Sequence, residues 1–119
     1  MNRALPLAIT FVAAGILLTA ACRGAPVITR VTVRNAEFEQ LRTLASSREL
    51  EHFSLLFAQK KKTSPPQHVA WAYKVDLEVE GRAERWLYHP DGWLQVLSKA
   101  ETPVYMLDSP AEFRKLVLE

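Results

Sequence analysis

The sequence predicts a small, single α+β domain in which an antiparallel β-meander packs with two N-terminal helices and one C-terminal helix. Three observations lead to this fold class. Every odd position from residue 69 to 79 is apolar, two turn sequences containing glycine follow, and apolar residues recur at helical spacing on both sides of this region. A length of 119 residues leaves room for one such domain.

Residues 1–21 have the features of an export signal. Arg3 supplies a positive charge near the start, residues 5–21 carry no charge, and two alanines precede Cys22. The apolar stretch is shorter than the roughly 20 residues that a membrane span needs. We therefore expect a signal peptide that is removed.

The junction Leu18-Thr19-Ala20-Ala21-Cys22 resembles the lipobox of bacterial lipoproteins. The resemblance implies cleavage before Cys22 and attachment of diacylglycerol to its sulfur. Thr19 stands where that family more often has Leu, and the alternative is an ordinary signal peptidase cut that leaves Cys22 as a free thiol. Cys22 is the only cysteine, so it has no partner for an intramolecular disulfide. This favours the lipid anchor.

The resemblance also implies a place in the cell envelope. Attached acyl chains contribute about 0.8 kcal/mol per buried CH₂ group, so several chains would hold the protein at a membrane. Residues 22–30 would form the lipidated cysteine and tether, and residues 31–119 the folded domain. Arg23 follows the cysteine, in place of the Asp that resembles an inner-membrane retention signal. We therefore expect an outer-membrane location facing the periplasm.

Between the tether and the meander we expect one strand and two helices. The stretch from Val27 to Val33 is rich in β-branched residues, which favour a strand. Asn35 is expected to cap a first helix, because apolar residues then recur at helical spacing. These residues are Phe38, Leu41, Leu44 and Ala45.

A second helix is predicted to begin at Ser46. Ser46 and Glu49 have the spacing of a capping box, and a stripe of Leu50, Phe53 and Phe57 follows. The prolines at 65 and 66 cannot continue a helix. The basic run at 60–62 is therefore expected at the solvated end of this helix, with a weak contact to a membrane surface or a partner as the alternative.

The alternating stretch predicts a half-buried strand that opens a hairpin. From residue 69 to 79 every odd position is apolar, while charged residues occupy even positions from Lys74 onward. Glu80 and Gly81 suit a two-residue loop, because glycine tolerates positive φ. Across this loop the expected pairs are Tyr73 with Tyr88, Val75 with Trp86, and Asp76 with Arg85.

A second hairpin is predicted at His89-Pro90-Asp91-Gly92-Trp93, with Gly92 at the left-handed position of a three-residue loop. It would pair Tyr88 with Leu94 and Trp86 with Val96. Both hairpins turn Trp86 and Tyr88 to the same face. Because a slip of one residue would invert a whole strand, this agreement favours a three-stranded meander.

A further short strand and a final helix complete the prediction. The strand covers residues 104–107, after a loop with Thr102-Pro103. Ser109-Pro110-Ala111-Glu112 combines an N-cap, a first-turn proline and a capping-box glutamate. The buried stripe of this helix is expected to be Phe113, Leu116 and Val117.

The sequence contains no motif that demands catalysis, a metal or a cofactor. It lacks G-x-S-x-G, H-E-x-x-H and a phosphate-binding glycine loop. Of its 15 Lys and Arg, Arg3 lies in the removed segment, which leaves 14 against 13 Asp and Glu. Such a balance argues against nucleic acid as a partner. We expect a protein that is not an enzyme and has no cofactor.

Three histidines were candidates for chemistry. Glu49 and His52 match half of a carboxylate-bridged metal motif, but the second half is missing, so a solvated or locally hydrogen-bonded pair is expected. His68 is expected at the surface. His89 and Asp91 flank a turn proline, where turn hydrogen bonds are favoured over acid/base catalysis.

The candidate partner-binding residues are Leu87, Trp93 and Leu97. In the predicted register they point away from the core, on the side of the sheet that carries Lys74, Asp76 and Arg85. An exposed apolar patch that contains a tryptophan is typical of a contact site. The alternative is that a helix or the segment from Val27 to Val33 covers these residues.

Two hypotheses for the function follow. The first is a membrane-anchored lipoprotein that binds an envelope protein through Leu87, Trp93 and Leu97, as an inhibitor or assembly accessory. The second is a carrier or sensor of a small apolar ligand held between helices and sheet near Trp71, Tyr73 and Trp86. In its anchor, its size and its R-W-L-Y-x-P-x-G-W core at 85–93, the chain resembles small uncharacterised lipoproteins of proteobacteria. That resemblance transfers no site residues.

Overall fold

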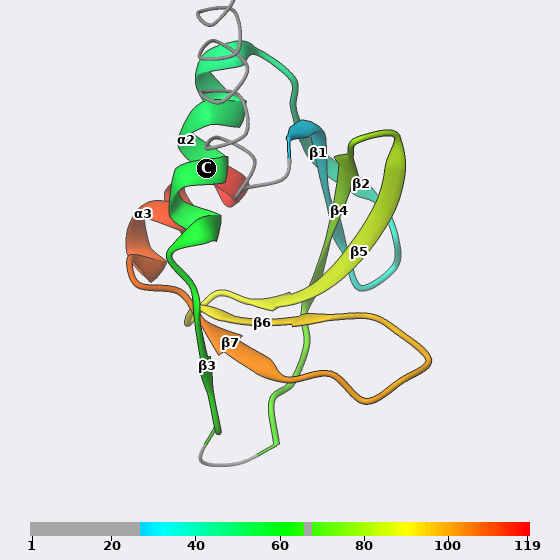
Figure 1. Cartoon of the computed structure of the whole chain (residues 1–119), viewed down its shortest axis with the longest axis vertical. Helices are drawn as coiled ribbons and strands as arrows, with labels where there is room; N and C mark the ends of the chain where they lie inside the picture. Colours follow the sequence, from blue (N-terminus) through cyan, green and yellow to red (C-terminus); the bar gives the residue numbers. More distant parts are fainter. Residues whose placement is uncertain (1–26, 66–67) are drawn as a thin grey trace, which may run out of the picture.

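Residues 27–65 and 68–119, which the computed structural model describes, form an α+β domain with one antiparallel sheet of seven strands and two helices (Figure 1). In chain order the elements are β1 (Ile28–Asn35), β2 (Gln40–Leu44), α2 (Ser47–Ala58), β3 (Lys61–Thr63), β4 (Tyr73–Val79), β5 (Arg82–His89), β6 (Trp93–Val96), β7 (Val104–Met106) and α3 (Pro110–Leu118). The predicted signal peptide and Cys22 lie outside the described residues.

The strands lie in the order β2-β1-β4-β5-β6-β7-β3, and every neighbouring pair is antiparallel. The long β5 bends strongly, so β6 and β7 run across the direction of β1 and β4 (Figure 1). Both helices lie on the same side of the sheet. The predicted meander is therefore the centre of a larger sheet.

Both predicted hairpin registers are confirmed. Across the first loop Tyr73 pairs with Tyr88 and Asp76 with Arg85, and across the second Tyr88 pairs with Leu94. Glu80 and Gly81 have φ values of 49° and 82°, as a two-residue loop with two left-handed positions requires. The strand itself begins at Tyr73, so the prediction of a strand from Val69 was four residues too long.

The core lies between the helices and one face of the sheet, and its centre is aromatic. The ring centroids of Phe53 and Phe113 are 5.3 Å apart and join α2 to α3. Phe113 packs edge-on against Tyr88 at 5.2 Å, and Phe57 against Trp86 at 4.9 Å. Trp86 and Tyr88 thus face the helices, as both hairpins predicted.

The predicted helix after Asn35 is wrong, because this segment forms the turn and second strand of a hairpin. The Asn35 side chain does cap backbone groups, but its Oδ1 accepts from the N–H groups of Glu37 and Glu39 in a tight turn. Leu44 is buried and Leu41 is exposed at the irregular end of β2, where the register with β1 shifts. Residues 27–65 and 68–119 therefore contain two helices where three were expected.

The predicted start of α2 is confirmed and its predicted end is not. The Glu49 N–H donates to Ser46 Oγ at 3.2 Å, as an N-cap requires. The helix ends at Ala58, and residues 61–63 form β3, which pairs with β7. The basic run is therefore not a helix end, and Lys60 is half-buried.

The C-terminal prediction holds in outline. A strand at residues 104–106 is followed by α3, with Phe113 and Val117 buried and Leu116 partly buried. Ser109 makes no side-chain capping bond, so the expected N-cap contact is absent there. Pro110 occupies the first turn, where its missing N–H costs nothing.

Candidate functional site

The three candidate binding residues lie on the side of the sheet that the helices leave uncovered. Leu87 alternates with the inward-facing Trp86 and Tyr88, and Trp93 precedes the buried Leu94. The Leu97 N–H donates to the Arg85 carbonyl at 2.8 Å, which continues the ladder and keeps Leu97 on the side of Trp93. We call this side the outer face; it carries Lys74, Asp76, Arg85, Leu87, Trp93 and Leu97.

The structure argues against both alternatives for these residues, namely cover by a helix and cover by the segment from Val27 to Val33. The helices pack on the opposite side through Phe57 and Phe113. The segment that includes Val27 to Val33 runs beside β4 as a strand of the sheet, not over it. Leu97 is 54% exposed, and Leu87 and Trp93 are partly exposed.

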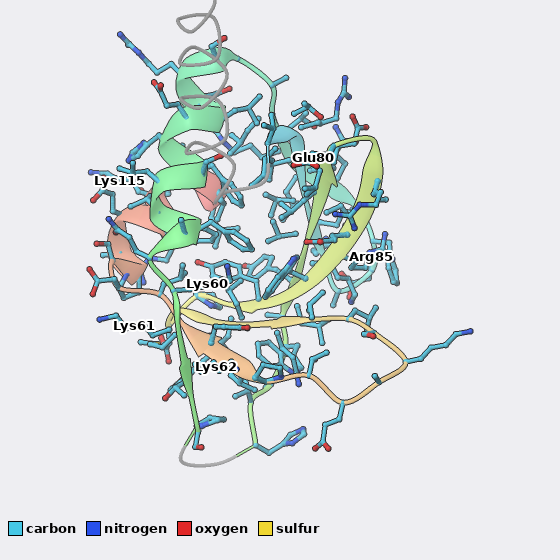
Figure 2. All side chains as sticks on the ribbon, viewed as in Figure 1. Lys60, Lys61, Lys62, Glu80, Arg85 and Lys115 are labelled. Atoms are coloured by element: carbon cyan, nitrogen blue, oxygen red, sulfur yellow. The ribbon has the colours of Figure 1, made fainter. Side chains whose placement is uncertain are left out.

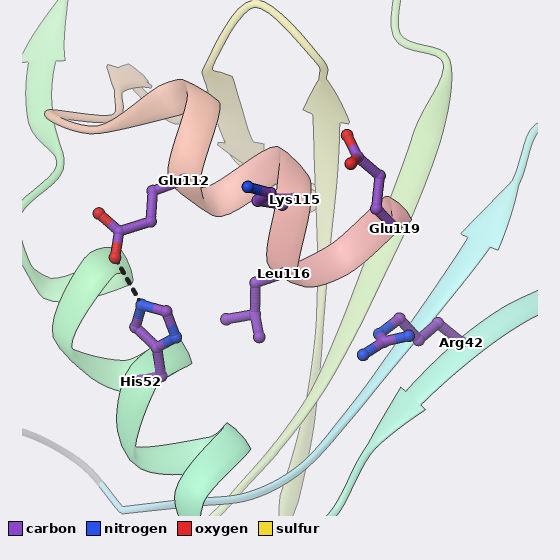
Figure 3. A pocket seen from close by; sticks show the side chains of 6 residues that line it. All are labelled: Arg42, His52, Glu112, Lys115, Leu116 and Glu119. Carbon is purple, nitrogen blue, oxygen red and sulfur yellow. Dashed lines mark hydrogen bonds and ion pairs between the residues drawn. The ribbon is translucent and has the colours of Figure 1, made fainter.

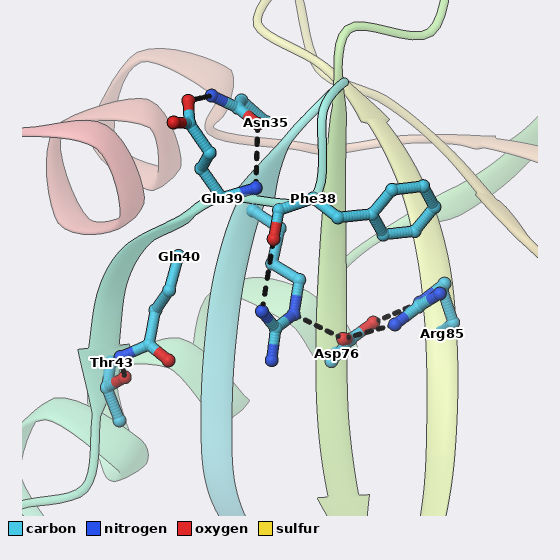
Figure 4. A network of polar contacts seen from close by, with 8 residues as sticks. Asn35, Phe38, Glu39, Gln40, Thr43, Asp76 and Arg85 are labelled. Atoms are coloured by element: carbon cyan, nitrogen blue, oxygen red, sulfur yellow. Dashed lines mark hydrogen bonds and ion pairs between the residues drawn. The ribbon is translucent and has the colours of Figure 1, made fainter.

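Asp76 is the centre of a charge network on the outer face (Figure 4). Arg85 donates from Nε and Nη2 to its two carboxylate oxygens at 2.7 and 2.8 Å, and Arg34 Nε donates at 3.1 Å. Burial alone would raise the pKa of Asp76, but the hydrogen bonds from Arg85 and Arg34 outweigh it and hold this pKa below its usual value. Asp76 therefore stays ionised at neutral pH.

Phe38 brings an aromatic ring to this network. Its backbone has φ of 67°, a left-handed conformation that costs energy for a bulky residue. The carbonyl of Phe38 accepts from Arg34 Nη1 at 3.2 Å, which helps to hold the turn. The ring is 50% exposed, and its centroid lies 4.6 Å from Lys74 Nζ. The same centroid lies 5.1 Å from Cζ of Arg85, toward which the ring points in Figure 4. Phe38 thus extends the apolar part of the outer face.

On the helix side, Lys60 lies among aromatic rings, two residues after the end of α2 (Figure 2). Its Nζ is 3.8 Å from the centroid of the Phe57 ring, 5.2 Å from that of Trp86 and 5.3 Å from that of Tyr105. Burial lowers the pKa of Lys60, and the charge of Glu84 opposes this effect in part.

A small cavity lies beside Lys60, between α2 and the sheet. Its volume is about 110 Å³, and it is lined by Ile28, Ser54, Phe57, Ala58, Lys60, Leu77, Val79 and Glu84. An open groove of about 400 Å³ shares Ile28, Ser54 and Ala58 with it and continues along α2 to Leu55 and Val27. The cavity is not lined by Trp71, Tyr73 or Trp86, where an apolar ligand had been expected.

His52 links the two helices and is not paired with Glu49. Its Nε2 donates to Glu112 Oε2 at 2.7 Å, beside a hollow of about 450 Å³ that Arg42 and Lys115 also line (Figure 3). Glu49 instead accepts from Arg42 and from the Ser46 hydroxyl. Glu49 and His52 are therefore not hydrogen-bonded to each other, although both side chains are partly exposed, at 34% and 42%.

His89 and Asp91 do make a turn contact. The Asp91 N–H donates to His89 Nδ1 at 3.0 Å, so this nitrogen acts as an acceptor. His68 is exposed and lines a surface hollow together with His89 and Trp93. Within the described ranges, no three His, Cys, Asp or Glu residues gather as a metal site.

Phe38 and Lys60 were missed as site residues in the sequence. The spacing of Phe38 to Leu44 fits a helical stripe, which hid the exposed ring on the turn. Lys60 stood in a basic run, and its aromatic neighbours Trp86 and Tyr105 are 26 or more residues away in sequence. Either residue could be identified as a site residue only from the pairing of strands that lie far apart in the sequence.

No protein-family model, no curated protein and no solved structure matches this chain. Among the described residues, no helix combines the length and apolar composition needed to cross a bilayer.

Proposed function

We propose that this chain is a lipoprotein of the bacterial cell envelope, anchored by acyl chains on Cys22, that binds another envelope protein and is not an enzyme. The observation that carries the proposal is the outer face, where Leu87, Trp93 and Leu97 lie on a sheet surface that neither helix covers. Large, partly exposed apolar side chains on one face favour a binding role.

The charges of the outer face indicate the chemistry of the partner. Two guanidinium groups, of Arg34 and Arg85, share the carboxylate of Asp76. Within the described residues, Lys74 has no carboxylate within 4.0 Å, and its ammonium group lies over the exposed ring of Phe38. A protein surface that presents carboxylates beside an apolar anchor would complement this arrangement.

Site-specific photo-crosslinking in cells tests this role. A photoreactive residue at position 97 should join the chain to a protein partner, while the same residue at position 55 should not. Leu55 is the matched control because it is 60% exposed on α2, close to the 54% of Leu97, but lies on the helix side. Equal yields of the same product at both positions would contradict the proposal.

Charge reversal tests the chemistry of the partner. Lys74→Glu should lower the crosslink yield at position 97, because it places a negative charge where we propose that carboxylates bind. Lys99→Glu, in the exposed loop between β6 and β7, is the control and should leave the yield unchanged. An unchanged yield with Lys74→Glu would reject an acidic partner.

A second candidate function is the binding of a small apolar ligand. The cavity beneath α2 and the groove that adjoins it favour this role, since both are lined mainly by apolar side chains such as Ile28 and Ala58. The ligand would lie at this position and not near Trp71 or Tyr73.

A further inference from the structure

The ammonium group of Lys60 has hydrogen-bonding capacity that the protein does not use. It can donate three hydrogen bonds, and its acceptor in the described part of the chain is the Phe57 carbonyl at 3.3 Å. No carboxylate of the described residues lies within 4.0 Å of it. Lys60 also lines the cavity, so its remaining donors can serve water or a ligand there.

Glu84 lines the same cavity, but it has partners of its own. Its Oε1 accepts from Trp86 Nε1 at 3.0 Å, and its Oε2 lies 3.9 Å from Arg82 Nη1. Arg82 therefore offsets part of the negative charge of Glu84. Lys60 lines the same cavity and has no ion pair with any described residue.

Apart from Ser54 and from Glu51 in the groove, the remaining lining residues are apolar and suit a hydrocarbon chain. The cavity is lined by apolar groups of Ile28, Leu77 and Val79, and it opens into the groove along α2. Val27 and Leu55, which line the groove, are 62% and 60% exposed. The site therefore combines a cation in the wall of the cavity with an apolar path that leads to the surface.

We propose that the cavity and groove bind a single acyl chain, with its anionic head group paired to Lys60 Nζ. This inference rests on the second candidate function and names its ligand class. The head group supplies the direct ion pair that Glu84 does not make with Lys60, and the chain removes apolar surface of Leu55 and Val27 from water. A free fatty acid and a lysophospholipid share this chemistry.

Titration calorimetry on the full-length chain with Cys22→Ser tests the proposal without an acyl group on the protein itself. Dodecanoate should bind, and Lys60→Met should weaken it about ten-fold or more, because the charged hydrogen bond is lost while the apolar stem remains. Dodecanol should bind equally to both proteins. Lys61→Met, on the exposed side of β3, is the control and should bind dodecanoate normally.

The outcomes distinguish a failure of the anionic head group from a failure of the small-ligand role. If Lys60→Met binds dodecanoate as well as the unchanged chain does, the anionic head group is rejected while a small-ligand role stands. If neither dodecanoate nor dodecanol binds, both are rejected. Lysophosphatidylglycerol in place of dodecanoate shows which source of the head group is preferred. Ser54→Trp keeps Lys60 and fills the junction of cavity and groove, so it should weaken both ligands even if Lys60→Met does not fold.

A photoreactive C12 acid added to the native chain in its membrane fraction locates the site. Peptides that contain residues 54–60 should carry the label. Labelling confined to peptides of the outer face around Leu87 would overturn the proposal.

Discussion

Arg85 holds Asp76 with two hydrogen bonds across neighbouring strands, from Nε at 2.7 Å and from Nη2 at 2.8 Å. Such a bidentate pair fixes the orientation of both side chains. Arg34 reaches the same carboxylate from β1, so a single aspartate ties three strands together on the outer face. The network positions the Phe38 turn and Lys74 beside the candidate binding residues.

Asp76→Asn should lower the free energy of unfolding by about 1 kcal/mol at neutral pH, because two charged hydrogen bonds of a partly exposed group are weakened. The folded-state pKa of Asp76 lies below its unfolded value of 3.8. Its stabilising contribution is therefore complete above pH 3.8 and is lost as the pH falls through the folded-state pKa. Urea unfolding from pH 7 to pH 2 should show that the free energies of unfolding of Asp76→Asn and of the unchanged protein converge at acid pH. A difference that persists unchanged at pH 2 would contradict this.

Tyr88→Phe should raise the free energy of unfolding, by about 1 kcal/mol. The Tyr88 side chain is fully buried, and its hydroxyl has no hydrogen-bond partner in the described structure. Removing an unpaired polar group from the core therefore removes a desolvation cost. Urea denaturation at pH 7 measures the change, and a loss of stability would mean that the hydroxyl is hydrogen-bonded in solution.

Tyr88 should also produce an alkaline loss of stability. Burial raises the pKa of Tyr88 to about 12 from 10.0. The folded state keeps the Tyr88 proton to a higher pH than the unfolded state does. The stabilisation linked to this proton is therefore fully present below pH 10 and is lost as the pH rises toward 12. The unfolding free energy measured between pH 9 and pH 12 should fall less steeply in Tyr88→Phe. Parallel curves for the two proteins would count against a buried hydroxyl.

Gly92→Ala should destabilise the domain more than Gly81→Ala. Both glycines have positive φ, of 109° and 82°, so each alanine is strained by its backbone. A Cβ at Gly92 would also lie 2.8 Å from the Cβ of Pro110, whereas one at Gly81 would meet nothing within 4 Å. We expect thermal unfolding to show a loss of about 1 kcal/mol at Gly81 and a larger one at Gly92. Equal losses would mean that α3 can move away from the turn.

The hairpins could be predicted from sequence because their signals are local and agree with one another. Alternation assigns residues such as Val75 and Asp76 to opposite faces, and the turn glycines at 81 and 92 set the register. The same local evidence failed after Asn35. There the Asn35 side chain caps a tight turn. The apolar residues whose spacing fits a helix belong instead to strand β2, which pairs with β1.

The two candidate sites differ in the same way, because one depends on local sequence signals and the other on long-range strand pairing. The outer position of Leu87 and Trp93 followed from the registers of the two predicted hairpins. The surroundings of Lys60 depend on β3 pairing with β7, which brings Tyr105 near the end of α2. Strand β3 has three residues, too few to show a period in the sequence.

Intact-mass measurement of the protein in the membrane fraction is the decisive test of the lipid anchor on Cys22, because it reports cleavage and acylation together. We predict a chain that begins at Cys22 and carries the added mass of its acyl groups. We also expect Cys22→Ser to release the protein from the membrane. A full-length chain without acyl groups in the soluble fraction would contradict this prediction.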